Sequence, residues 1–254
     1  MSSFTRNVLL FGSTGCGKSS IVNMLSDSEK AVTSSGAKGC TFKNEAYDVT
    51  LDGDVYTIFD TTGMDEGTEA TVKSADALAS LYKLIDRLSD GINLLAFVMR
   101  GPRITEHAEK NYSVFYEGIC EKKVPIVIII TGMENEDPMD AWWEKNETHF
   151  VTTEMLFDGH ACITATRGKM TNKGYKNEFE YQESQDLVRE LIRANCRNHG
   201  WKMEKKWWYQ RVWAWLSGRF RSVYIPADFQ NFYDTLSRFM RPEDAKQIID
   251  KINH

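Results

Sequence analysis

The sequence lacks the features that mark fibrous, disulfide-rich or membrane-spanning proteins. Glycine (17 residues) and proline (5) are too few for a collagen-like or low-complexity chain of 254 residues. Five cysteines are an odd number for a disulfide framework, so we expect a reducing compartment. No stretch holds 18 consecutive apolar residues, which argues against a membrane-spanning helix. The N-terminal MSSFTRN lacks a signal-peptide core and a myristoylation glycine, and the C-terminal IDKINH is no prenylation box. These absences together predict a cytoplasmic protein.

Charge divides the chain into two unequal parts. Residues 201–254 carry ten Lys/Arg against six Asp/Glu, whereas residues 1–200 carry 21 against 30. An acidic body argues against a nucleic-acid-binding protein, which would spread basic charge over its main domain. The change of sign predicts a main domain at 1–200 and a basic, tryptophan-rich helical extension at 201–254.

The main domain alternates short apolar runs with amphipathic segments. Such alternation predicts an α/β fold with a mainly parallel central sheet between two layers of helices. Asp52-Gly53 predicts a tight hairpin between two of the strands. The expected strands are 7–11, 44–51, 54–60, 92–99, 124–131 and 161–165, and the expected helices are 18–25, 68–88, 106–120, 139–150 and 177–198.

A phosphate-binding loop (P-loop) is the strongest signal in the chain. Residues 12–19 read GSTGCGKS and match GxxxxGK[ST] at every position, between a strand and a helix. Glycines let backbone N–H groups turn toward phosphate oxygens, and the helix N-terminus adds partial positive charge. Lys18 can span the β- and γ-phosphates, and the Ser19 hydroxyl can ligate Mg²⁺. This predicts a P-loop NTPase fold whose nucleotide-binding residues are Ser13, Thr14, Gly15, Cys16, Gly17, Lys18, Ser19 and Ser20.

Cys16 has two interpretations. A thiol at a helix N-terminus can have a lowered pKa and be sensitive to oxidation. The alternative, which we favour, is a small side chain that fills a tight loop.

A second phosphate-side motif, DTTG, ends the second hairpin strand at residues 60–63. The Asp60 carboxylate can reach Mg²⁺ through water, and the Gly63 N–H can bind the γ-phosphate. Thr41, in the polar segment before the hairpin, is the candidate for a second hydroxyl ligand. The predicted metal ligands are therefore Ser19, Thr41 and Asp60, and the predicted catalytic residues are Lys18, Thr41 and Gly63.

The order GSTGCGKSS, GAKGCTF, DTTG resembles a translation-factor-type GTPase domain. More narrowly, the chain is similar to the septin-related group of GIMAP immunity-associated GTPases and Toc chloroplast-import receptors. The further similar segments are RGPRITEHAEK (100–110), Trp142-Trp143 with Asn146, and ACITATRG (161–168). The resemblance covers roughly residues 5–200. It implies a G domain that binds GTP and GDP with Mg²⁺.

The base-reading segment departs from this family. Where the family has a segment like [NT]KxD, this chain has Thr131-Gly132-Met133-Glu134, so the lysine that usually stacks on the base is missing. The Glu134 carboxylate could accept hydrogen bonds from guanine N1–H and the 2-amino group, a donor pair that adenine lacks. The family's last motif, which contacts guanine O6, is represented by residues 164–166. We therefore expect Thr131, Glu134, Ala165 and Thr166 to bind the base of GTP, with ATP as the alternative.

The sequence predicts slow hydrolysis. Met64 stands where many small GTPases have a glutamine that orients water, and no arginine occurs between Arg6 and Arg87. The resemblance implies activation by homodimerisation across the nucleotide face, with Lys38, Arg100 and Arg103 as candidates to act in trans. Two alternatives remain, which are a non-hydrolysing, septin-like scaffold and a P-loop ATPase or kinase.

The C-terminal extension begins with WKMEKKWWYQRVWAWLS (201–217). On a helix, five tryptophans in this segment form a broad apolar arc and a second patch bordered by basic residues. The arc is expected to pack on the main domain. The alternative is a peripheral membrane contact through residues 201–221, because Trp and Lys/Arg are typical of interfacial helices.

Overall fold

A computed structural model of the chain describes residues 5–26, 45–61, 88, 91–104 and 106–202. Its centre is a six-stranded sheet with the order β2-β3-β1-β4-β5-β6. All neighbouring pairs are parallel except β2 with β3. The sheet is therefore mixed and mostly parallel, as predicted. Its strands are β1 (Arg6–Phe11), β2 (Glu45–Leu51), β3 (Asp54–Asp60), β4 (Leu94–Arg100), β5 (Ile126–Thr131) and β6 (Gly159–Ile163).

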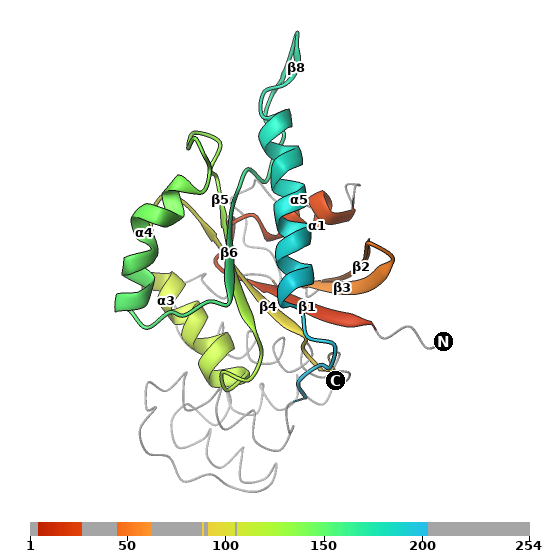
Figure 1. Cartoon of the computed structure of the whole chain (residues 1–254), viewed down its shortest axis with the longest axis vertical. Helices are drawn as coiled ribbons and strands as arrows, with labels where there is room; N and C mark the ends of the chain where they lie inside the picture. Colours follow the sequence, from red (N-terminus) through yellow and green to blue (C-terminus); the bar gives the residue numbers. More distant parts are fainter. Residues whose placement is uncertain (1–4, 27–44, 62–87, 89–90, 105, 203–254) are drawn as a thin grey trace, which may run out of the picture.

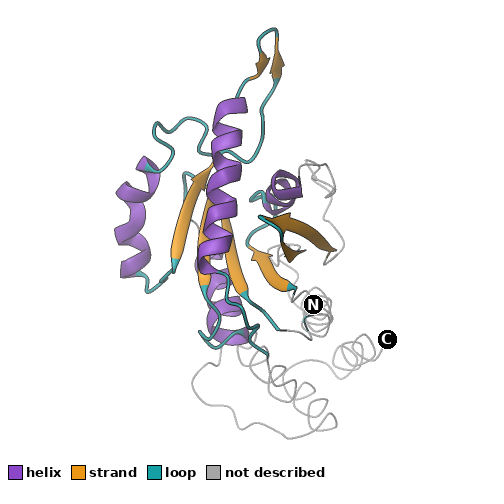
Figure 2. Cartoon of the chain, turned by 45° about the vertical axis from the view of Figure 1, so that its right-hand side comes forward, coloured by secondary structure: helices purple, strands orange, loops and turns teal. Residues whose placement is uncertain are grey.

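Helices cover both faces of the sheet, so the described part of the chain has three layers (Figures 1 and 2). One face packs on α1 (Lys18–Ser26) and α5 (Glu178–Asn195), and the other packs on α3 (Glu106–Tyr112), the π-helix η1 (Ser113–Ile119) and α4 (Ala141–Thr152). Because β5 has helices above and below it, its sequence IVIIIT is buried at all six positions. The apolar run that predicted this strand is explained by burial on both of its faces.

Local signals located most of the described elements, with shifts of a few residues at their ends. Asp52 and Gly53 both have positive φ and connect β2 to β3, as the Asp-Gly signal predicted. The expected helix over 106–120 is instead α3 followed by η1, in which the Cys120 N–H donates to the Phe115 carbonyl five residues earlier. The expected helix over 68–88 lies outside the described residues.

A short hairpin between β6 and α5 was not predicted. Its strands are β7 (Met170–Thr171) and β8 (Gly174–Tyr175), and it projects beyond the sheet at the N-terminal end of α5 (Figure 1). Strands of two residues are too short to show an alternating pattern in a sequence.

The first residues of the C-terminal extension contact the main domain. Trp201 forms a two-way backbone bridge with Ile92, with both N···O distances at 2.8 Å. The Trp201 side chain is partly buried against the core on the α3 face. Residues 203–254 lie outside the described residues, so the membrane contact through 201–221 and the boundary at residue 200 stay predictions. No helix of the described part is long and apolar enough to cross a bilayer.

The Trp201 contact can be tested by truncating the side chain. Trp201→Ala should lower the free energy of unfolding by about 2 kcal/mol, less than a fully buried tryptophan because this one keeps some exposure. Urea denaturation measures the loss, and Lys202→Ala, which changes the exposed neighbouring residue, is the matched control. Equal midpoints for Trp201→Ala and the wild type would show that the indole does not stabilise the domain.

Candidate functional site

The carboxyl ends of the parallel strands define one edge of the sheet, and the predicted site residues gather along it. β1 lies between β3 and β4, so the strands that follow it in the sequence lie first on one side of β1 (β2 and β3) and then on the other (β4, β5 and β6). Ligands of open α/β sheets bind at such a switch point. The segment that follows β1 here is the P-loop, residues 12–19.

The P-loop turns sharply at its first residue. Gly12 has φ +145°, and a Cβ at this position would lie 2.0 Å from the carbonyl oxygen of Val98. Only glycine fits this close approach between the loop and β4. The Lys18 Nζ lies inside the loop, where it donates to the carbonyl oxygens of Gly12 (2.8 Å) and Ser13 (2.9 Å). Lys18 as a whole is only 6% exposed, so the fold holds a positive charge at the centre of the loop.

Cys16 fills the interior of this loop. It is 3% exposed, and burial raises the pKa of its thiol, while the neighbouring Lys18 ammonium opposes that rise only in part. The interpretation of Cys16 as a low-pKa, oxidation-sensitive thiol is therefore wrong, because desolvation outweighs the helix terminus and the lysine. The small buried side chain that we favoured is what the structure shows.

The end of β3 brings a carboxylate to the same place. The register pairs Asp60 with Leu10, and the Thr61 N–H and hydroxyl both donate to the Leu10 carbonyl (3.2 and 2.8 Å). β3 thus stays attached to β1 up to the loop. There the Ser19 hydroxyl donates to Asp60 Oδ2 at 2.6 Å. A hydroxyl and a carboxylate in contact are hard oxygen donors of the kind that Mg²⁺ prefers, so these two residues fit the predicted metal.

The end of β5 supports the P-loop from its other side. The Thr131 hydroxyl is buried and donates to the Cys16 carbonyl at 2.6 Å. Asn111 of α3, whose side chain is 4% exposed, lies against the loop with its amide nitrogen 3.5 Å from the Ser13 hydroxyl. Sequence reasoning proposed Thr131 as a base-binding residue and missed Asn111, because nothing in the local pattern of α3 marks it.

The predicted base-reading residues follow two neighbouring strands, β5 and β6. Glu134 comes three residues after β5 and is half-buried, in a segment held to β6 by the Met133 N–H donating to the Ile163 carbonyl (3.1 Å). Ala165 and Thr166 come directly after the buried Thr164. The Thr164 N–H donates to the Ser184 hydroxyl of α5 (2.9 Å), which fixes the position of this segment. The structure therefore places both segments at one edge, and Ser184 is a positioning residue that the sequence did not reveal.

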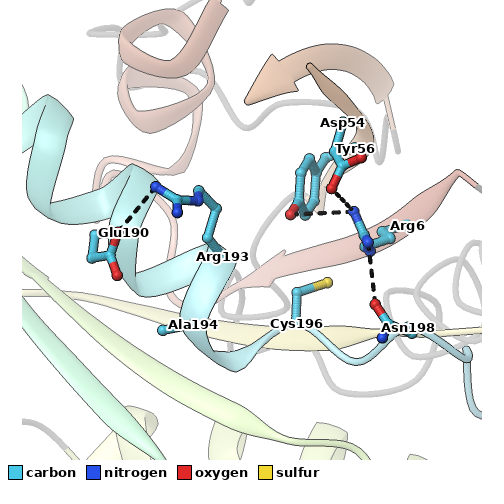
Figure 3. A pocket seen from close by; sticks show the side chains of 8 residues that line it. All are labelled: Arg6, Asp54, Tyr56, Glu190, Arg193, Ala194, Cys196 and Asn198. Carbon is cyan, nitrogen blue, oxygen red and sulfur yellow. Dashed lines mark hydrogen bonds and ion pairs between the residues drawn. The ribbon is translucent and has the colours of Figure 1, made fainter. Parts of the chain in front are cut away.

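A surface pocket lies at the opposite edge, where the strands begin (Figure 3). Arg6 there donates to Asp54 (2.6 Å) and Asn198 (3.1 Å), and Arg193 pairs with Glu190 (3.1 Å). Its charged groups neutralise one another, and it shares no residue with the P-loop edge. This pocket is therefore separate from the predicted nucleotide site.

Several predicted residues lie outside the described part of the chain. They are Lys38, Thr41, Gly63 and Met64.

Comparison with known proteins supports a GTPase assignment. Residues 7–132, close to half of the chain, match the family model described as 50S ribosome-binding GTPase. No curated protein matches the chain in sequence.

Solved structures share the fold at low identity. A dimerization-deficient mutant of Toc33 from Arabidopsis thaliana has a TM-score of 0.56 at 17% identity, with 79% of this chain and 88% of that chain covered. Era in complex with MgGDPNP and a 16S ribosomal RNA segment has a TM-score of 0.55 at 12% identity, with coverages of 98% and 86%. Era from Aquifex aeolicus bound to GDP·AlF₄⁻ has a TM-score of 0.53 at 15% identity, with coverages of 79% and 60%.

These identities establish the fold alone, whereas the family model matches the sequence from β1 through β5. The chain contains a domain of the P-loop GTPase fold, and its residues 7–132 match the family model described as 50S ribosome-binding GTPase.

Proposed function

We propose that this domain binds GTP and GDP with Mg²⁺, hydrolyses GTP slowly, and acts in the cytoplasm as a nucleotide-controlled switch or assembly module. The observation that carries the proposal is the contact between Ser19 and Asp60 beside the buried Lys18 ammonium. A fixed positive charge and two oxygen donors then meet where a bound phosphate chain would end.

Ser19 and Asp60 would hold the Mg²⁺ ion, with Thr41 as the further ligand that the sequence predicts. When bound, the ion neutralises charge on the β- and γ-phosphate oxygens. The donor set supports this assignment, because Mg²⁺ is usually held by one or two protein oxygens together with phosphates and water. That Era, a protein of the same fold, was solved with MgGDPNP is consistent with it.

Slow turnover follows from the residues around the phosphate side. The Met64 thioether cannot orient a water molecule, and the P-loop and the segment up to Asp60 contain no arginine. An arginine supplied by another molecule typically raises GTP turnover by about 10³–10⁵-fold. A second copy of the chain is the proposed source, as the resemblance to the septin-related group implies. The Toc33 structure supports this only as a dimerising protein of the same fold.

Removal of the loop ammonium tests phosphate binding. Lys18→Ala should weaken GTP and GDP binding about a hundredfold, because it removes charge-assisted hydrogen bonds that together contribute about 3 kcal/mol. Calorimetric titration measures the affinity, and circular dichroism checks that the variant is folded.

Lys122→Ala is the matched control, since Lys122 is an exposed lysine that pairs only with Glu117 among the described residues. A folded Lys18→Ala protein with wild-type affinity would contradict the assignment of residues 12–19 as the phosphate site.

Base preference tests the role of Glu134. Glu134→Ala should lower the ratio of GTP to ATP affinity by about thirtyfold, the effect of losing a paired carboxylate acceptor worth about 2 kcal/mol. Competition titrations with the two nucleotides give the ratio for each protein. Glu136 lies in the same loop as Glu134 and pairs with Lys145 of α4. Glu136→Ala is therefore the matched control and should leave the ratio unchanged. An unchanged ratio in Glu134→Ala would move the specificity determinant to Asp137 or elsewhere.

Turnover at increasing protein concentration tests activation by a second copy. Wild-type specific activity should rise with concentration, and Arg103→Ala should reduce the rise at least tenfold, because Arg103 is exposed beside the phosphate edge. Arg193→Ala removes an exposed arginine at the opposite edge and should keep the rise. A wild-type rate per molecule that is constant at all concentrations would favour the non-hydrolysing scaffold or an unrelated activator instead.

A further inference from the structure

Gly132 leaves a space at the base edge of the site. It directly follows β5 and has φ +85°, a conformation that suits glycine and few other residues. Two residues later comes Glu134, the proposed guanine acceptor. A purine bound by Glu134 would therefore lie near Gly132, which has no side chain to stack on the base.

Arg100 borders that space. It is the last residue of β4, and the sheet register pairs it with Thr131, the residue before Gly132. A Cβ added to Gly132 would stand 3.6 Å from Arg100 Cγ and 3.8 Å from Arg100 Nε. The arginine side chain thus lies within ordinary contact distance of the point where a side chain at residue 132 would begin.

The guanidinium of Arg100 is available for a ligand. Arg100 is exposed, and among the described residues no hydrogen bond or ion pair holds its guanidinium. A guanidinium is planar and delocalised, and it stacks on aromatic faces better than a lysine ammonium does. A purine base offers such a face.

We infer that Arg100 stacks on the nucleotide base bound to its own chain, in the place that Gly132 leaves open. This inference rests on the proposed nucleotide site and adds a residue to it. Glu134 then selects guanine by hydrogen bonding, while Arg100 stabilises any purine. The sequence had suggested Arg100 as a residue that acts on a second copy, whereas this placement assigns it a role within one chain.

The two roles predict different results in dilute protein. Arg100→Ala should weaken both GDP and ADP binding about tenfold and leave the ratio of the two affinities unchanged. The affinity for inorganic pyrophosphate, which has no base, should stay at the wild-type value. Arg100→Lys should fall between the two proteins, because it keeps the charge and loses the plane.

Arg193→Ala, which removes an exposed arginine from the opposite edge, is the control for loss of charge and should keep wild-type GDP affinity. Wild-type GDP affinity in Arg100→Ala would overturn the inference, and so would an equal loss of pyrophosphate and GDP binding. Failure of the wild type itself to bind GDP would instead refute the proposed function. Competition titrations below the concentration at which turnover rises provide all these measurements.

Discussion

The attachment of the P-loop to three strand ends is the constraint on which the site depends. Glycine-rich loops have little stiffness of their own, so neighbouring structure must hold their shape. β1 runs directly into the loop, β3 reaches it through the contact between Asp60 and Ser19, and β5 reaches it through Thr131 and the Cys16 carbonyl. β1, β3 and β5 all run in the same direction, which brings their carboxyl ends to one edge. The sheet therefore positions both the positive charge of Lys18 and the proposed metal ligands.

The parts of the fold that sequence reasoning located are those with local causes. β5 was marked by an unbroken apolar run, the hairpin by Asp52-Gly53, and the phosphate loop by fixed spacing between glycines and Lys18. Each signal reports a requirement that a few consecutive residues meet by themselves. The same reasoning explains why the two-residue strands of the β7–β8 hairpin and the wider turns of η1 were missed. Neither differs from its surroundings in a property that consecutive residues display.

The residues that sequence reasoning missed act across long chain separations. Ser184 holds the Thr164 N–H from 20 residues away, and Asn111 approaches Ser13 across 98 residues. The sequence named Arg100 only as a candidate to act on a second copy. Its contact with Gly132 arises because β4 and β5 are neighbours in register, which no local pattern encodes. The sequence did show that a lysine was missing from the base-reading segment. The structure shows that Arg100 lies beside this position.

Thr131 connects the two halves of the site physically. Its hydroxyl holds the P-loop, and its backbone leads directly into Gly132 and Glu134. Phosphate contacts depend on charge and backbone N–H groups, so they cannot distinguish guanine from adenine. Base contacts beyond β5 can make that distinction, but they contribute only if the phosphate end fixes the nucleotide in register. Because one threonine contacts the loop and starts the proposed base-reading segment, a shift of either end moves the other. Contacts at the two ends should therefore contribute to affinity non-additively, as expected for groups that share one rigid support.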